Sequence, residues 1–194
     1  MRKTDTTVDV EKIKHGVKLI LEGIGEDISR EGLFETPDRM AKMYGELFSA
    51  VGREDDPVEP KVFTVQNDGM VAEHGITFYS MCEHHMLPFF GHAAIAYIPD
   101  GEVIGLSKLV RIVDFYSRKL QLQERLTDEI ARAVSRKVKN KGVHVVLSAE
   151  HLCVSMRGIA KPSSVTVSIA STGAFAKDKS LRDEAMALFQ VPVK

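Results

Sequence analysis

The sequence has little net charge and no long apolar run. Its 26 lysines and arginines nearly balance 27 aspartates and glutamates, so nothing global favours nucleic acid or an anionic membrane as a partner. No stretch approaches the roughly 18 apolar residues of a membrane span, and residues 1–16 are charged and polar, unlike a signal peptide. We therefore expect a cytoplasmic protein that binds neither nucleic acid nor a membrane.

Cysteine is also scarce, since only Cys82 and Cys153 occur in 194 residues. Cytoplasmic thiols are kept reduced, so a structural disulfide between them is not expected. Each cysteine is then a buried thiol, a nucleophile or a metal ligand.

Several motifs that carry familiar chemistry are missing. There is no H-E-x-x-H and no H-x-E followed by P-C-x-x-C, which disfavours a metalloprotease or a standard base deaminase. There is also no P-loop, and the G-I-G at 23–25 is not a dinucleotide fingerprint. A nucleotide, if one binds, must be held in another way.

The length and the 44% hydrophobic content suit one globular domain with a helical appendage. Apolar residues at helical spacing predict a helix over 10–24. Thr36 as N-cap and Pro37 at the first helical position predict the start of a second helix. The charged segment 52–61, with two prolines, indicates a boundary. We expect an N-terminal helical part at 1–60 and a catalytic domain at 61–194.

The second part alternates between strand and helix patterns. Strands are predicted at 75–81, 91–98, 143–149 and 163–171, and helices at 107–119 and 123–140. The order strand, strand, helix, helix, strand, strand favours an α+β fold. We expect an antiparallel sheet with two helices packed on one face.

Cysteine and histidine occur together twice. Cys82 and His85 have the spacing C-x-x-H, and His151 and Cys153 lie two apart at the end of a predicted strand. If the segments converge, His84 joins them as a fifth candidate, although any one of these histidines could also be a core or surface residue. The H-x-C spacing is too tight for a usual zinc finger, so three ligands with an open fourth position fit better. Such a metal activates water.

Four ordered blocks identify a known family. They read S-M-C-E-H-H at 80–85, I-G-L-S-K-L-x-R at 104–111, Q-x-Q-E-R-L-T at 121–127 and H-x-C-V-x-x-R-G at 151–158. Together they closely resemble GTP cyclohydrolase I, from about the E-T-P-D-R segment at 35 to the strand after Arg157.

The resemblance implies a zinc enzyme that converts GTP and water to 7,8-dihydroneopterin triphosphate and formate, the entry step to folate. It also implies the tunnelling fold and a homodecamer of two face-to-face pentamers. In the family, the positions of Cys82, His85 and Cys153 hold zinc, and those of His84 and His151 are catalytic.

The resemblance further implies where the substrate binds. Glu124 matches the carboxylate that accepts the N1–H and 2-amino group of guanine, with Gln123 beside it. The triphosphate is expected at Ser107, Lys108, Arg111 and Arg157, with Arg39 as a weaker candidate. As isolated residues these would be read as ordinary surface groups, and Glu83 has no role that the sequence indicates.

Two other readings remain open at this stage. In one, the zinc is structural and the chain only binds a pterin or nucleotide, although the intact His84, His151 and Glu124 argue against this. In the other, the chain is a relative with the same fold that acts on a different purine or pterin, such as a nitrile reductase or a metal-dependent pterin synthase. A reductase needs a cysteine free of metal, and both cysteines are expected to be ligands.

Overall fold

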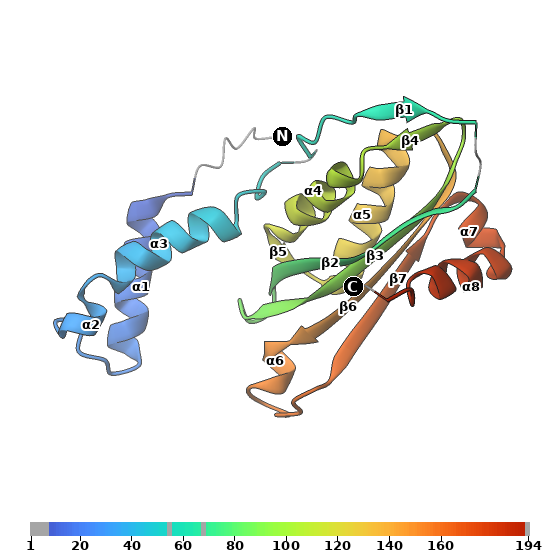
Figure 1. The fold of residues 1–194 in the computed structure, drawn as a ribbon. Coiled ribbons are helices and arrows are strands. Elements are labelled where there is room, and N and C mark those ends of the chain that lie inside the picture. Colours follow the sequence, from blue (N-terminus) through green and yellow to red (C-terminus); the bar gives the residue numbers. More distant parts are fainter. Residues whose placement is uncertain (1–7, 54–55, 67–68, 193–194) are drawn as a thin grey trace. The chain divides into compact units, whose positions relative to one another are not determined.

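Figure 1 shows the fold in a computed structural model, which describes residues 8–53, 56–66 and 69–192. The chain forms two compact units, Met1–Arg53 and Glu54–Lys194. This division lies a few residues before the boundary at residue 60 that the composition suggests. Among the described residues, none of the helices has both the length and the apolar character required to cross a lipid bilayer.

The first unit is helical, as expected. It contains α1 (Val10–Gly23), α2 (Glu31–Phe34) and α3 (Thr36–Leu47). The side chain of Asp9 caps α1 by accepting from the backbone N–H of Lys12 at 3.0 Å. The prediction that Thr36 caps α3 is wrong, because α2 leads almost directly into α3. Thr36 is already helical, and its hydroxyl donates to the carbonyl of Gly32 instead.

The second unit contains a five-stranded sheet in the order β5-β2-β3-β6-β7. Neighbouring strands are antiparallel, except that β5 pairs with β2 in parallel. The sheet strands are β2 (Val71–Cys82), β3 (Pro88–Pro99), β5 (Leu120–Gln121), β6 (Asn140–His151) and β7 (Val165–Ser171). A separate two-stranded sheet pairs β1 (Val62–Thr64) with β4 (Glu102–Ile104).

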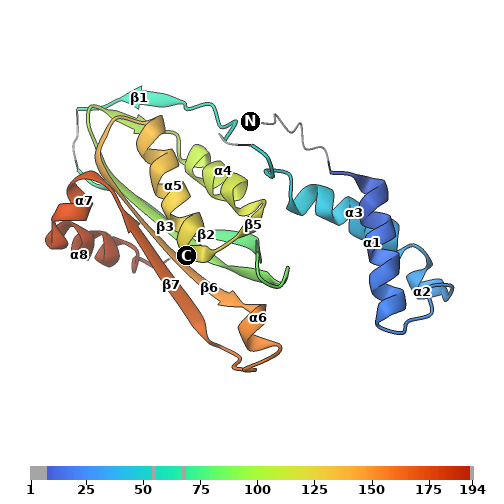
Figure 2. The same ribbon diagram turned by 180° about the vertical axis from the view of Figure 1, so that it is seen from behind.

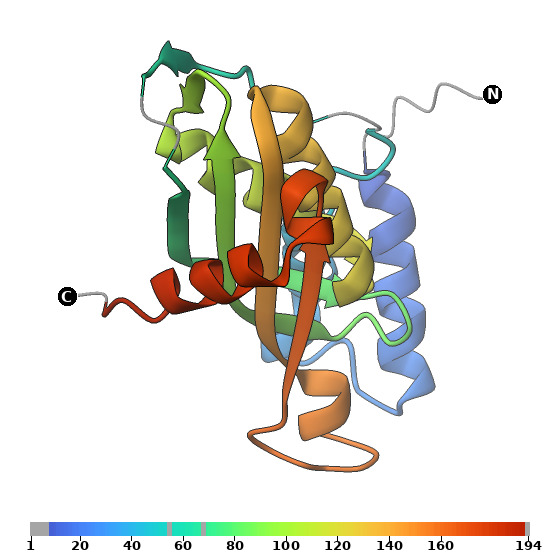
Figure 3. The ribbon, with the colours of Figure 1, turned by 90° about the vertical axis from the view of Figure 1, so that its right-hand side faces the viewer.

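Helices cover both faces of the larger sheet. Figures 2 and 3 show α4 (Leu106–Ser117) and α5 (Gln123–Lys137) along one face, which is the expected pair. The helix predicted to reach residue 140 ends at Lys137, because Val138 is extended and leads into β6. The other face carries α7 (Gly173–Lys177) and α8 (Lys179–Leu188). These two helices were not predicted from the sequence.

Alternation along β6 divides the core between these layers. Val143, Val145 and Leu147 belong to the main apolar core with residues of α4 and α5. His144 points to the opposite face, where its ring stacks on Phe175 of α7. The fold is therefore α+β, with a main core on one side of the sheet and a smaller one on the other.

The chain brings distant segments together at one end of the sheet. Cys82 ends β2, and Cys153 lies in α6 (Leu152–Ser155), directly after β6. Gln121 of β5 pairs with Cys82, and α5 begins two residues later at Gln123. Three of the four motif blocks thus meet at this end.

Candidate metal centre and active site

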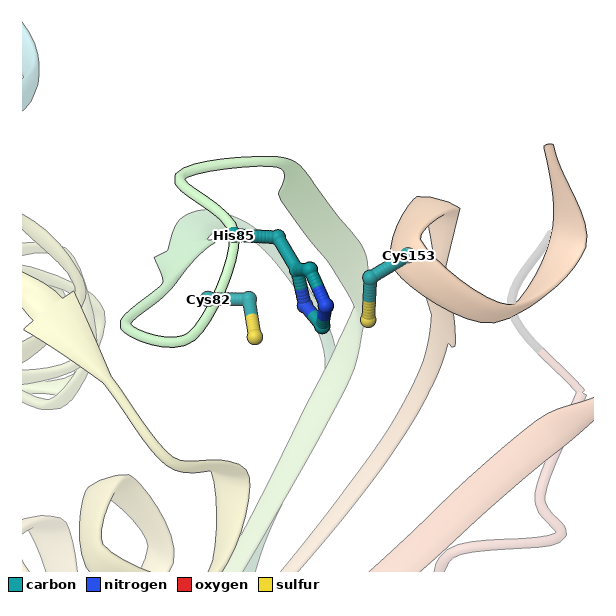
Figure 4. A group of neighbouring side chains, drawn as sticks. All are labelled: Cys82, His85 and Cys153. Atoms are coloured by element: carbon teal, nitrogen blue, oxygen red, sulfur yellow. The ribbon is translucent and has the colours of Figure 1, made fainter. Parts of the chain in front are cut away.

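Cys82, His85 and Cys153 form a compact cluster. One donor atom from each residue lies within 4.8 Å of the other two. Figure 4 shows the imidazole of His85 between the two sulfurs, which approach from β2 and α6. Tetrahedral zinc with thiolate and imidazole ligands needs donor separations of roughly 3.5–3.8 Å. A closure of at most about 1 Å therefore fits the cluster to zinc.

A tight turn sets the position of Cys82 relative to His85. The backbone N–H of Met86 donates to the carbonyl of Cys82 at 2.9 Å, and the N–H of Cys82 donates to the carbonyl of Leu87 at 2.8 Å. Met86 closes this turn with φ of 51°, in the left-handed region that residues other than glycine rarely adopt. Such conformations concentrate at functional sites.

The environment of the two sulfurs favours a cation. Burial raises the pKa of the Cys153 thiol, and the nearby Cys82 sulfur raises this pKa further. Two thiolates side by side repel each other unless a positive charge lies between them. A divalent ion supplies that charge and deprotonates its thiol ligands.

His151 is held in a defined orientation beside this cluster. Its Nε2 lies 2.7 Å from Oε1 of Gln123, and its ring stacks on Phe89 with centroids 4.6 Å apart. Burial lowers the pKa of His151, while the charge of Glu124 raises it. Phe89 was not predicted as a site residue, because an apolar residue next to a predicted strand has no feature that separates it from the core.

The surroundings of Gln123 determine which nitrogen of His151 carries a proton. The amide nitrogen of Gln123 donates to the carbonyls of Leu147 and Thr166, at 3.1 and 3.0 Å, and to the hydroxyl of Ser168. Carbonyls only accept, so the amide orientation is settled and Oε1 must accept from His151. The neutral ring is therefore protonated at Nε2, which leaves Nδ1 as the acceptor.

This arrangement differs from the expectation that Gln123 contacts the substrate. Its side chain is only 2% exposed and its amide is already bonded on both sides. A side-chain contact to guanine would require the loss of one of these bonds. Substrate binding by Gln123 stays a prediction, whereas its contact with His151 is a feature of the fold.

Other predicted residues line the same end of the sheet. His84 is exposed, and its ring centroid lies 6.3 Å from that of His85. Glu124 is exposed in the first turn of α5, close enough to His151 to affect its pKa. An Arg157 nitrogen lies 3.4 Å from Nε2 of His85. These groups surround the cluster with two imidazoles, one carboxylate and one guanidinium.

The remaining predicted residues lie elsewhere in the chain. Ser107, Lys108 and Arg111 occupy the first turns of α4, whereas the other end of this helix leads to β5 beside Cys82. At 1.5 Å per residue, ten helical residues separate the two ends by about 15 Å. Arg39 lies in α3 of the first unit, where it pairs with Glu35. Ser107 and Lys108 therefore lie far from the end of α4 that leads to the cluster, and Arg111 lies about 9 Å from that end.

Comparison with known proteins agrees with the geometry. The family model described as GTP cyclohydrolase I matches residues 13–190. A Clostridium perfringens protein named GTP cyclohydrolase 1 is 54% identical over 177 residues, covering 91% of this chain and 96% of the relative. A Streptococcus pneumoniae protein of the same name is 51% identical over 181 residues, covering 93% and 98%.

A solved structure of an archaeosine synthase QueF-like protein is 19% identical, with a TM-score of 0.46. The match covers 56% of this chain and 98% of that protein, and it is too distant to add to the assignment. The family match spans most of the chain and includes all four motif blocks. The chain therefore belongs to the GTP cyclohydrolase I family of hydrolases.

Proposed function

We propose that Cys82, His85 and Cys153 hold a zinc ion, and that at this site the chain opens the imidazole ring of GTP. The products are formate and 7,8-dihydroneopterin triphosphate, and the reaction takes place in the cytoplasm. The main support is the convergence of three zinc-type donors from distant segments, within 4.8 Å of one another and next to an oriented histidine.

In this proposal, His151 and His84 transfer protons at different parts of the substrate. Zinc, when bound, supplies a Lewis acid that makes hydroxide available at neutral pH for attack on carbon 8 of the purine. His151 exchanges a proton with the purine ring through Nδ1, because Nε2 is engaged with Gln123. The exposed His84 handles protons where the ribose opens and rearranges.

Glu124 supplies selectivity for guanine in this proposal. Its carboxylate is exposed in the first turn of α5 and can accept from both N1–H and the 2-amino group. Adenine would leave the carboxylate facing an unprotonated N1 without a second donor, so a carboxylate that the bound base removes from water would lose its partners. Gln123 lies next to Glu124 in the sequence and fixes the ring of His151. This pair of adjacent residues therefore links purine recognition to proton transfer.

The triphosphate is proposed to lie between subunits. Arg157 is beside the metal cluster. Along α4, Ser107 lies about 15 Å and Arg111 about 9 Å from the helix end that leads to the cluster. A neighbouring copy can supply Lys108 and Arg111 as cations and the hydroxyl of Ser107 as a hydrogen-bond donor, and Arg39 is a further candidate. This agrees with the expected homodecamer.

The edge strand β7 also favours an oligomer. Its alternate residues Val165, Val167 and Ile169 are each 57–58% exposed. An edge strand with an apolar face of this kind offers both free backbone groups and apolar area to a second chain.

The decisive experiment measures metal content and formate release together. We expect about one zinc per chain, and formate plus a fluorescent oxidised pterin from GTP. His85→Ala should lose both the zinc and the activity, because only two of the three protein ligands would remain to bind the ion. His92→Ala is the matched control, since His92 is exposed on β3 outside the cluster.

Either of two results would contradict the proposal. Formate release that survives complete zinc removal would show that the metal is not needed. Zinc at one per chain without any formate from GTP would show a structural metal instead.

A further inference from the structure

Glu83 lies between the ligand Cys82 and the histidines, yet the proposed chemistry gives it no task. Its Oε2 accepts from Nη2 of Arg125 at 2.5 Å, across 42 residues of sequence. Its backbone N–H donates to the carbonyl of Gln121 at 3.1 Å. The turn that carries His84 and His85 is thus joined to α5 by the side chain of Glu83 and to β5 by its backbone.

Arg125 is itself held on a rigid support. Its Nε donates to Oε1 of Gln121 at 2.9 Å, and its Nη2 donates to the carbonyl of Leu120 at 3.1 Å. Gln121 is fully buried, and its amide nitrogen donates to the carbonyl of Tyr116 and to Glu129. These two acceptors fix the amide so that its oxygen faces the guanidinium. Arg125 therefore presents one defined donor to Glu83.

The same short stretch of chain also holds the other half of the site. Gln123 fixes the ring of His151. Glu124, which lies between Gln123 and Arg125 in the sequence, is exposed. Residues 121, 123 and 125 thus connect both the ligand turn and the end of β6 to the same short segment at the start of α5.

We propose that Arg125 is a positioning residue, which acts through Glu83 to set the position of the ligand turn relative to α5 and Glu124. This inference rests on the function proposed above. In this inference, Glu83 and Arg125 set the distance between the metal and the purine, and neither residue contacts the substrate.

Partial exposure makes the inference testable. The side chains of Arg125 and Glu83 are 41% and 31% exposed, and ion pairs of this kind contribute little to global stability. If the pair were only a surface salt bridge, its removal would change little. If it positions the ligand turn, zinc affinity and turnover should fall while the fold stays intact.

The test uses Arg125→Gln and Glu83→Gln in the full chain, with thermal unfolding as a check on folding. Zinc affinity is measured without GTP by competition with a chromophoric chelator. We expect both variants to bind zinc about tenfold more weakly, as for other residues that support metal ligands. Their kcat should fall by a similar factor, with KM for GTP within about twofold of wild type.

Two further variants separate positioning from general charge effects. Arg125→Lys keeps the charge opposite Glu83 but loses the fork to Gln121 and Leu120, so it should recover only part of the affinity. Arg132→Gln is the matched control, since Arg132 forms an ion pair with Asp128 at 2.9 Å on the same helix. It should leave zinc affinity and kcat unchanged.

The outcomes distinguish the two proposals. A wild-type chain that neither binds zinc nor releases formate refutes the proposed function. A wild-type chain that does both, with variants of equal zinc affinity and kcat, refutes the positioning role alone. A rise in KM without a change in zinc affinity also refutes it, because Arg125 would then contact the substrate.

Discussion

Strand β6 carries two histidines that can be compared directly, His144 near its start and His151 at its end. They are seven residues apart, an odd number, so they project to opposite faces of the sheet. His151 faces α5 and bonds to Gln123. His144 faces the layer of α7 and α8, and its Nδ1 bonds to Ser171 at 2.8 Å.

The two environments are similar in several respects. Each ring has one nitrogen bonded to a polar side chain, and each stacks on phenylalanine, His151 on Phe89 and His144 on Phe175. Burial lowers the pKa of both. A lowered pKa therefore does not distinguish His151 from His144.

The second nitrogen separates them. Nε2 of His144 is buried and has no hydrogen-bond partner among the described residues. Its ring lies close to Phe175 and Phe189, with Arg182 as the nearby charge. His151 is only half-buried and lies within the influence of Glu124. The lower burial of His151, together with the nearby metal donors, supports the proposal that this histidine transfers protons.

The largest effect that tests this difference is expected from His151→Ala. Loss of a positioned acid or base typically costs about 10²- to 10⁴-fold, so formate release should fall by at least about 100-fold. Zinc content should stay near one per chain, since the three ligands are intact. His144→Gln is the control and should keep wild-type formate release per folded chain. Full activity in His151→Ala would remove the distinction between the two histidines.

A smaller effect is expected from the residues that hold each ring. Gln123→Met has a similar volume but cannot accept from His151, so kcat should fall about 10- to 100-fold with zinc still bound. Ser171→Ala removes the corresponding partner of His144. It should leave kcat unchanged and lower the free energy of unfolding by about 1 kcal/mol. An equal loss of kcat in both variants would show that neither contact is specific to catalysis.

Local sequence patterns were sufficient for most of the fold and for the metal donors. Apolar spacing predicted α1, α4, α5 and the four long sheet strands. The motif blocks pointed to Cys82, His85 and Cys153, which do meet in space. These features depend on short-range periodicity or on residue types with a narrow chemical use.

The features that escaped prediction depend on contacts between distant segments. The pairing of Glu83 with Arg125 spans 42 residues, and that of His151 with Gln123 spans 28. No local pattern reports which polar side chain will lie opposite another after folding. The Thr36 cap failed for a related reason, because the preceding helix supplied a different contact for its hydroxyl.

The smallest predicted effect is a pH dependence of stability that belongs to His144. Above pH of about 6.5 its ring is neutral in both the folded and the unfolded chain. Below that pH the unfolded chain takes up a proton, while burial keeps the pKa of His144 in the folded chain lower. The free energy of unfolding should therefore fall as the pH decreases, by at most about 1.4 kcal/mol per pH unit from this group.

Replacing the ring isolates this contribution. His144→Phe keeps an aromatic ring next to Phe175 and Phe189 but cannot take up a proton, so stability should fall less steeply below pH of about 6.5. The measurement is a series of urea unfolding curves for wild type and variant, recorded at steps of about one pH unit from about pH 5 to about pH 8. Identical pH profiles would mean that His144 becomes protonated in the folded chain. Its burial and its unpartnered Nε2 would then have no energetic consequence, and the contrast with His151 would rest on catalysis alone.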